Sequence, residues 1–309
     1  RSFLIPMKNH ETYNPCPLEE GTLTLNDISV NYRTWSKFGR PIVFLHGLAS
    51  SQNIWNLMAP LLAQKYQVTT FDQRGHGQSE KPTQGYDFET VARDAAIFIQ
   101  NLKIHNPIIV GHSWGGSVAL CLAVTYPELV SGLCFVDGGL IEISKVPGNS
   151  LDLALKNMAP PRWNNVKKTD LINRIRNRSW GDRDSTSKAV NLEDVVLSHL
   201  KVDENDFVSA NLSRENHLKI VEEFWKHRPS TMISKIKCPT LILPSRQSKS
   251  DTLDLKHEMV DMASQTIPIC DVVWLEESIH DVPLQRPELV SDLIAKRIEA
   301  GFFPDPEQK

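Results

Sequence analysis

A serine enclosed by glycines constrains the fold of this chain more than any other feature of its 309 residues. Residues 111–116 read GHSWGG, after an apolar, strand-like run at residues 108–110 and at the start of a helical pattern over residues 114–125. Glycine two positions before and two positions after Ser113 permits a sharp strand-to-helix turn, because a Cβ at either position would collide across the turn. Such a turn strains the backbone of its central residue and exposes that side chain. The pattern predicts that Ser113 is a nucleophile at the end of a buried strand.

Short apolar runs alternate with helical patterns along most of the chain. The runs cover residues 42–45, 68–71, 108–110, 133–136, 240–243 and 271–275, and turn residues bound them, which is typical of strands covered on both faces. Helical spacing of apolar residues covers 54–65, 88–102 and 287–297, and residues 114–125 are apolar nearly all round, as in a central buried helix. Residues 21–35 alternate between apolar and polar types, as antiparallel edge strands do. The alternation predicts the α/β class, with a mostly parallel sheet and helices on both faces.

The alternation of strand-like runs and helical patterns is absent between residues 141 and 230. The stretch has no convincing strand, several amphipathic helical patterns and three of the seven tryptophans, Trp163, Trp180 and Trp225. We interpret residues 141–230 as a helical cap inserted between two parts of one core, residues 1–140 and 231–309. The three tryptophans indicate an apolar or bulky substrate, unless they only form the core of the cap.

A second glycine loop follows the first buried run, at residues 46–48. Gly47 allows this loop to pass close to the nucleophile, so that the backbone N–H groups of Leu48 and Trp114 can form an oxyanion hole. We assign structural roles to His46 and to the glycine-containing turn at residues 72–79. The indole of Trp114 either lines the acyl pocket or is plain packing.

His280 is the predicted general base. It follows the run that ends at residue 275 and precedes the last helical pattern, which places it at the same edge of the sheet as Ser113. Pro283 prevents the last helix from extending back to include His280. Most of the other nine histidines are expected to be loop or surface residues.

These pieces together resemble the α/β-hydrolase family, and in particular its cap-bearing esterases and lactonases. The order nucleophile, acid, histidine is the order of that family. The resemblance implies that Ser113 attacks an acyl carbon, that His280 relays its proton and that an acid residue orients His280. It also implies that no metal or organic cofactor is needed. Epoxide hydrolases and haloalkane dehalogenases of this fold have an aspartate as the nucleophile in the strand-to-helix turn. Ser113 at this position therefore argues against both of these activities.

The acid is where this sequence departs from the family pattern. The family often takes it from the loop after the strand at residues 240–243, but the expected position holds Ser248, which is neutral. Asp251 lies three residues further on and is the alternative acid. Asp137 ends the preceding strand and is followed by two glycines that free the backbone to turn its carboxylate. We predict that Asp137 is the acid.

Composition excludes several other classes of protein. With 34 basic and 37 acidic residues, the formal net charge is −3. The chain therefore lacks the excess of positive charge that is typical of proteins that bind nucleic acids. No apolar run approaches the roughly 20 residues of a membrane helix, and the first residues do not resemble a secretory signal. The five cysteines are odd in number and include no CxxC pair, which indicates reduced thiols and a cytoplasmic location.

The sequence therefore predicts a serine hydrolase that acts on a small-molecule ester or lactone. Two alternatives stay open. One is a ligand receptor or regulator that keeps the fold without much turnover, because the loop at Ser248 is altered. The other is a cofactor-free perhydrolase or carbon–carbon bond hydrolase, which the same residues would serve.

Overall fold

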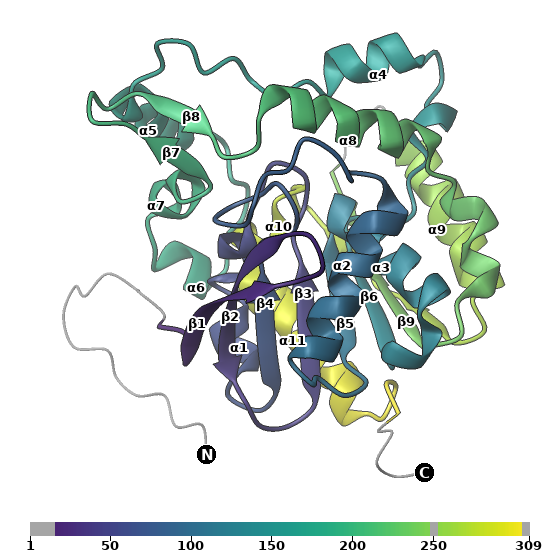
Figure 1. Ribbon diagram of the computed structural model, residues 1–309. Helices are drawn as coiled ribbons and strands as arrows, with labels where there is room; N and C mark the ends of the chain where they lie inside the picture. The colour runs from purple at the N-terminus through teal and green to yellow at the C-terminus, as the bar shows by residue number, and fades with distance from the viewer. Residues whose placement is uncertain (1–15, 248–252, 305–309) are drawn as a thin grey trace.

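Eight strands form one central sheet in the spatial order β1-β2-β4-β3-β5-β6-β9-β11 (Figure 1). The computed structural model describes residues 16–247 and 253–304. The strands of this sheet are β1 Glu19–Thr24, β2 Ser29–Ser36, β3 Pro41–Leu45, β4 Gln67–Phe71, β5 Ile108–His112, β6 Gly132–Val136, β9 Thr240–Leu243 and β11 Cys270–Val272. β2 pairs antiparallel with β1 and β4, whereas the pairings from β4 to β11 are parallel. The predicted mostly parallel sheet with an antiparallel edge is confirmed.

Helices cover both faces of the sheet. The core helices are α1 Ala59–Leu62, α2 Phe88–Asn101, α3 Trp114–Thr125, α9 Leu253–Thr266, α10 Val282–Gln285 and α11 Pro287–Glu299. Successive side chains of a strand point to opposite faces. Val43 and Leu45 accordingly share one apolar core with α2, α3 and α9, while Ile42 and Phe44 share another with α1 and α11. Within residues 16–247 and 253–304, no helix combines the length and apolarity that crossing a bilayer requires.

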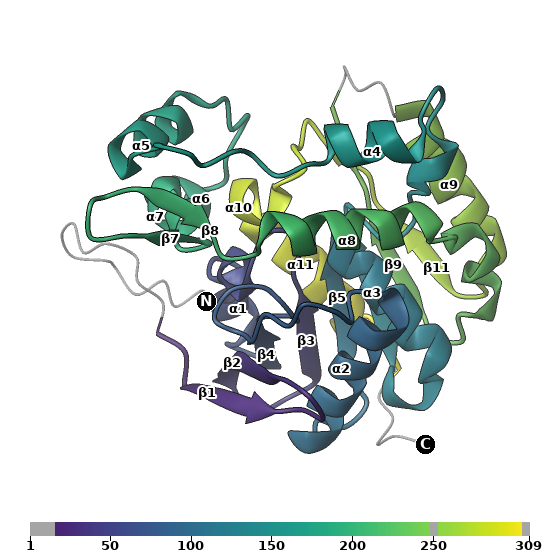
Figure 2. The same cartoon turned by 45° about the horizontal axis from the view of Figure 1, so that its top comes forward.

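A long segment, residues 137–239, is inserted between the neighbouring strands β6 and β9 and is called the inserted segment below. It contains α4 Leu151–Asn157, α5 Lys168–Asn177, α6 Ser185–Lys188, α7 Leu192–Leu197, β7 Leu200–Val202, β8 Val208–Ala210 and α8 Arg214–Lys226. Figures 1 and 2 both show α4 and α8 together above the sheet, with α5, α7 and the β7–β8 hairpin gathered at one side. The cap predicted from the sequence, residues 141–230, lies within this segment.

The prediction that this segment lacks strands is wrong, because β7 and β8 pair as an antiparallel hairpin. Each strand has only three residues, which is too short for an alternating pattern to be recognised. The turn between them is stabilised by Asp203, whose carboxylate accepts hydrogen bonds from the backbone N–H groups of Asn205 and Phe207.

Two core elements also differ from their predicted form. The helix expected over residues 54–65 is divided into a 3₁₀ turn, η1 Gln52–Trp55, and α1, because Pro60 has no N–H group and fits only in the first turn of a helix. The strand expected over residues 271–275 is divided into β11 and β12 Leu275–Glu276, and β12 pairs with β10 Ser245–Arg246 in a separate two-stranded sheet. The remaining 3₁₀ turns are η2 Pro127–Leu129, η3 Ile143–Lys145, η4 Pro229–Thr231 and η5 Ile233–Lys235.

A buried ion pair joins the turn after β4 to α2. The guanidinium of Arg74 donates from Nε to Asp94 Oδ2 at 2.7 Å and from Nη2 to Asp94 Oδ1 at 3.0 Å. The side chains of Arg74 and Asp94 are 1% and 3% exposed, whereas Asp27, which also contacts Arg74, is 59% exposed. The turn at residues 72–79 is therefore held by a charge pair that water does not screen.

We expect Asp94→Ala to lower the free energy of unfolding by about 3–5 kcal/mol, because it leaves the buried guanidinium without its principal partner. Asp27→Ala removes an exposed carboxylate from the same guanidinium and should cost less than about 1 kcal/mol. Urea unfolding of both variants and the parent chain measures the difference. Equal losses in the two variants would contradict the assignment of the stabilising pair to Asp94.

Candidate active site

Ser113 occupies a tight turn between β5 and α3. Its backbone has φ 54° and ψ −124°, a conformation that is costly for a residue with a side chain. A Cβ at Gly111 would lie 2.5 Å from the carbonyl oxygen of Gly115, so the chain crosses itself here without room for a methyl group. The predicted strand-to-helix turn is present, and the glycines are what allow it.

The structure brings Ser113, His280 and Asp137 together from three distant parts of the chain. His280 Nε2 lies 2.9 Å from Ser113 Oγ, and His280 Nδ1 lies 2.6 Å from Asp137 Oδ2. Asp137 directly follows β6, and His280 lies in the loop between β12 and α10. The contacts give one consistent proton arrangement, with Nδ1–H donating to the carboxylate and Nε2 accepting from the hydroxyl. The alternative acid Asp251, and Ser248, lie outside the described residues.

Asp137 and His280 shift each other's protonation. Burial raises the pKa of Asp137, but the hydrogen bond and positive charge of His280, together with Lys256, outweigh burial and hold that pKa well below its usual range. Burial lowers the pKa of His280, but the hydrogen bond to Asp137 and its negative charge outweigh burial and raise that pKa above its ordinary value. The pair therefore favours a carboxylate beside an imidazole of increased basicity.

The histidine before the serine supports the loop that carries His280. His112 Nε2 donates to the backbone carbonyl oxygen of His280 at 2.8 Å, and the two ring centroids are 4.9 Å apart. Burial and the nearby His280 lower the pKa of His112 to about 4, so His112 is neutral at neutral pH. Sequence reasoning did not assign this residue a role, although it lies within the glycine-framed motif.

Two backbone N–H groups are available beside Ser113. A Cβ at Gly47 would lie 3.1 Å from the Cβ of Ser113, which shows how closely the loop at residues 46–48 approaches the serine. The N–H groups of Leu48 and Trp114 have no hydrogen-bond acceptor in the described part of the chain. Trp114 also begins α3, where the helix dipole favours negative charge. The predicted oxyanion-hole residues thus lie on the two segments that flank the serine.

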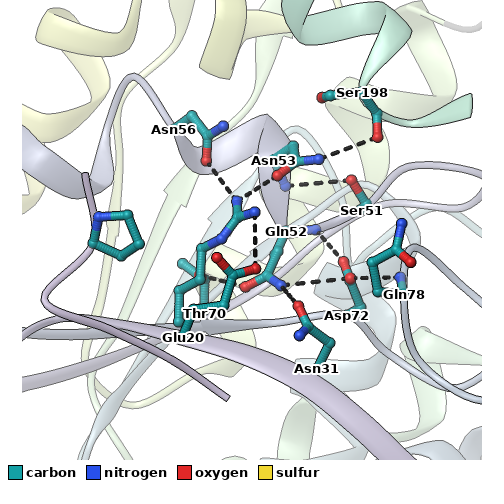
Figure 3. Close-up of polar contacts among 12 residues, drawn as sticks. Glu20, Asn31, Ser51, Gln52, Asn53, Asn56, Thr70, Asp72, Gln78 and Ser198 are labelled. Carbon is teal, nitrogen blue, oxygen red and sulfur yellow. Dashed lines mark hydrogen bonds and ion pairs between the residues drawn. The ribbon is translucent and has the colours of Figure 1, made fainter. Parts of the chain in front are cut away.

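A polar network fixes the turn that follows this loop (Figure 3). The N–H group of Gln52 donates to Asp72 Oδ1 at 2.7 Å, and its side-chain amide donates to Asn31 Oδ1 at 2.6 Å. Asn53 Nδ2 donates to the carbonyl oxygen of Ser198 at 3.2 Å, which connects the turn to the inserted segment. Asp72 therefore serves the loop structurally, in agreement with the role assigned to residues 72–79.

A cavity of about 220 Å³ opens onto the serine. Its apolar wall consists of Ile141, Ile143 and Phe224, and its polar wall includes Ser113, Asp137, His280 and Lys256. Phe224 belongs to α8, so the inserted segment covers the site. No three His, Cys, Asp or Glu side chains in the described ranges are arranged to hold a metal ion.

The tryptophans singled out in the sequence are packing residues. Trp114 is buried and its indole stacks on His76, with ring centroids 5.4 Å apart. Trp180 is buried in the inserted segment, and its Nε1 donates to the carbonyl oxygen of Ile175. Neither of these side chains lines the cavity beside Ser113, and the same holds for Trp163 and Trp225.

The inserted segment is anchored next to His280. Arg178 Nη2 lies 2.8 Å from Asp281 Oδ2, and the guanidinium covers the ring of Trp180. Ser187 Oγ donates to the carbonyl oxygen of Leu284 in α10 at 2.5 Å. These contacts tie one side of the inserted segment to the loop and helix that follow the histidine.

Sequence reasoning missed two partners of Asp137. Lys256 Nζ, from α9, lies 2.8 Å from Asp137 Oδ1, and the backbone N–H of Ser245 donates to the same oxygen at 2.9 Å. Ser245 is close because β6 and β9 are parallel neighbours, and their carboxyl ends meet at one edge of the sheet. No local pattern identifies Lys256, because its role depends on how α9 packs.

Residues 40–260 match the family described as alpha/beta hydrolase fold. The chain belongs to the α/β-hydrolase family. It is 37% identical over 113 residues to the soluble epoxide hydrolase of Corynebacterium sp. (strain C12), a match that covers 37% of this chain and 39% of that protein. It is 32% identical over 108 residues to 3-oxoadipate enol-lactonase 2 of Acinetobacter baylyi, which covers 35% of this chain and 40% of the lactonase.

Solved structures of similar fold extend the likeness to most of this α/β hydrolase. The crystal structure of E-2-(acetamidomethylene)succinate hydrolase superposes with a TM-score of 0.75 at 21% identity. That superposition covers 91% of this chain and 99% of the other. At this level of identity the likeness concerns the fold, and it extends over most of the chain.

We expect the imidazole of His280 to titrate with a midpoint above its ordinary value near 6.5, because the carboxylate of Asp137 stabilises the protonated ring. Asp137→Asn removes that charge and should lower the midpoint. NMR titration of ring protons in the parent chain and the variant measures both values, with His280→Gln used to assign the resonance. A midpoint that does not change in Asp137→Asn would contradict the pairing.

Proposed function

We propose that this protein is a serine hydrolase that cleaves a carboxylic ester or lactone through an acyl-enzyme on Ser113. The observation that carries the proposal is the continuous contact from Asp137 through His280 to Ser113, at 2.6 Å and 2.9 Å, beside a cavity. A serine, a histidine and a carboxylate in this order constitute a nucleophile, its base and the group that orients the base. A cytoplasmic location belongs to the same proposal.

In the first half of the reaction, Ser113 Oγ attacks the carbonyl carbon while its proton passes to His280 Nε2. The carbonyl oxygen becomes an oxyanion, which the N–H groups of Leu48 and Trp114 stabilise; one such donor typically contributes about 2.7–4 kcal/mol. Asp137 keeps the imidazole oriented and stabilises it when it is protonated. The carbon–oxygen bond of the ester then breaks, and the leaving oxygen takes the proton from His280.

In the second half, water attacks the acyl carbon of the ester on Ser113. His280 Nε2 accepts a proton from the water, and the same two N–H groups stabilise the second oxyanion. The bond to Ser113 Oγ breaks, and the serine recovers its proton from His280. The products are a carboxylic acid and the alcohol released earlier, or one hydroxy acid if the substrate is a lactone.

The cavity supports a substrate with a modest apolar group. A closed cavity of about 150 Å³ in another protein accommodates benzene, so a six-membered ring fits within the about 220 Å³ beside Ser113. Ile141, Ile143 and Phe224 provide apolar contacts for such a group. Because the four tryptophans discussed above do not line this space, they supply no argument for a bulky substrate.

Epoxide hydrolysis is not part of the proposal, although the Corynebacterium relative is called an epoxide hydrolase. The nucleophile in the turn between β5 and α3 is Ser113. Its attack on an acyl group forms an ester, which water can hydrolyse. Attack of a serine on an epoxide carbon would produce an ether, for which the same residues offer no route of release.

We expect Ser113→Ala to lower the turnover of p-nitrophenyl butyrate by roughly 10⁶-fold while circular dichroism and thermal unfolding stay unchanged. A fluorophosphonate probe should label the parent chain and leave the variant unlabelled. A ligand receptor on the same fold would show little turnover or labelling in the parent chain, and that result would end the proposal.

We expect Asp137→Asn to lower kcat by about 10⁴-fold, since the amide no longer holds the required tautomer of His280. Asp251→Asn makes the same chemical change at the alternative acid and should alter kcat by less than about threefold, because the proposal assigns the orientation of His280 to Asp137 and not to Asp251. Steady-state kinetics with p-nitrophenyl butyrate compare the two variants. The reverse ranking would assign the acid to Asp251.

A further inference from the structure

A lysine ammonium lies on the far side of Asp137 from the histidine. Lys256 belongs to α9, its side chain is 19% exposed, and its Nζ is 2.8 Å from Asp137 Oδ1. Lysine is seldom this buried unless it is paired. The proposed mechanism assigns no role to this charge, although Lys256 lines the same cavity as Ser113.

The ammonium of Lys256 is bonded to acceptors of the protein itself. Besides Asp137 Oδ1, its acceptors are the carbonyl oxygen of Ser245 at 3.0 Å and Ser245 Oγ at 3.4 Å. An ammonium has three donors, so these three acceptors account for all of them. A lysine that binds the carboxylate of a substrate would instead have at least one N–H donor free toward the cavity.

The two oxygens of Asp137 have separate partners. Oδ1 accepts from Lys256 Nζ and from the backbone N–H of Ser245, while Oδ2 faces His280 Nδ1. With Oδ1 held by two donors, rotation of the carboxylate about its Cβ–Cγ bond would break both contacts. Oδ2 is thereby kept in the plane that the imidazole needs.

We propose that Lys256 is a positioning residue of the active site, which holds Asp137 through Oδ1 so that Oδ2 orients His280. The inference rests on the proposed function for its catalytic consequence. Lys256 contacts neither Ser113 nor His280 directly and acts only through the carboxylate.

The charge of Lys256 also influences the titration of His280. The charged and titratable groups around His280 are Asp137 after β6, His112 in β5, the adjacent Asp281 with its partner Arg178, and Lys256 in α9. Burial lowers the pKa of His280, the two carboxylates raise it, and Lys256 lowers it. Removal of the lysine charge should therefore raise that pKa and move the acid limb of activity to higher pH.

The test compares Lys256→Met with the parent chain on p-nitrophenyl butyrate, which is neutral, and on mono-p-nitrophenyl succinate, which carries a carboxylate. We expect kcat to fall by about 10- to 100-fold on both esters, because a small misplacement of a catalytic group has effects of this size. We expect the acid limb of kcat/KM to move upward by about one pH unit. Lys256→Arg keeps the charge and should restore the acid limb.

Lys65→Met is the matched control. Lys65 lies just before the amino end of β4, whereas the candidate site lies at the carboxyl ends of the parallel strands. It pairs with Glu299 on the surface. Its replacement by methionine changes the net charge by the same amount as Lys256→Met. Its kinetics and pH profile should equal those of the parent chain. If Lys256→Met lowers the yield of folded chain, Lys256→Gln replaces it in each measurement.

Three results would overturn the inference. The first is an unchanged kcat and acid limb in Lys256→Met. The second is a rise in KM confined to the succinate ester, which would make Lys256 a substrate-binding residue. The third is an NMR midpoint of His280 that does not move upward in Lys256→Met. Because the NMR titration needs no turnover, it tests Lys256 even if the parent chain hydrolyses neither ester, a failure that would concern the proposed function alone.

Discussion

The turn at Ser113 is the constraint on which the rest of the site depends. One residue in a strained conformation converts the end of β5 into the start of α3, so the hydroxyl stands at the edge of the sheet with the helix N-terminus beneath it. The turn is possible only because neighbouring backbone segments approach without side chains. A Cβ on Gly138 would collide with the backbone of Ser113, and Gly138 is the residue that follows Asp137. The same close packing that strains the serine therefore brings the acid near it.

Parallel pairing explains why groups distant in sequence converge. The carboxyl ends of β5, β6 and β9 meet at one edge, and they deliver Ser113, Asp137 and Ser245 to adjacent positions. His280 reaches this edge from the loop after β12, which pairs with β10 beside it. Because the acid directly follows β6, its second oxygen is available to groups from the β9 side, namely Ser245 and Lys256. The position of the acid and the presence of a lysine partner are therefore linked.

The inserted segment contributes both a wall of the cavity and an anchor for the base. Phe224 of α8 closes the cavity, while Arg178 and Ser187 bind the loop and helix that follow His280. His199 Nδ1 also lies 2.6 Å from Ser51 Oγ, and Ser51 follows the loop that carries Leu48. Because these contacts touch both sides of the site, movement of the inserted segment would alter the loops that hold His280 and Leu48.

Local sequence determined the elements whose signals are local. The glycines around Ser113, the apolar runs of the parallel strands, the periodicity of α2 and α11 and the continuous apolarity of α3 are each contained in one short stretch, so the sheet and the serine turn were predictable. Where one proline or a three-residue strand decides the outcome, periodicity was not sufficient, as in the division of residues 54–65 and the β7–β8 hairpin. Only the tertiary structure decided that Asp137 faces His280, that Lys256 and Ser245 hold its other oxygen, and that the tryptophans lie outside the cavity. Those relations depend on the packing of segments far apart in the chain, and no spacing within a single segment encodes them.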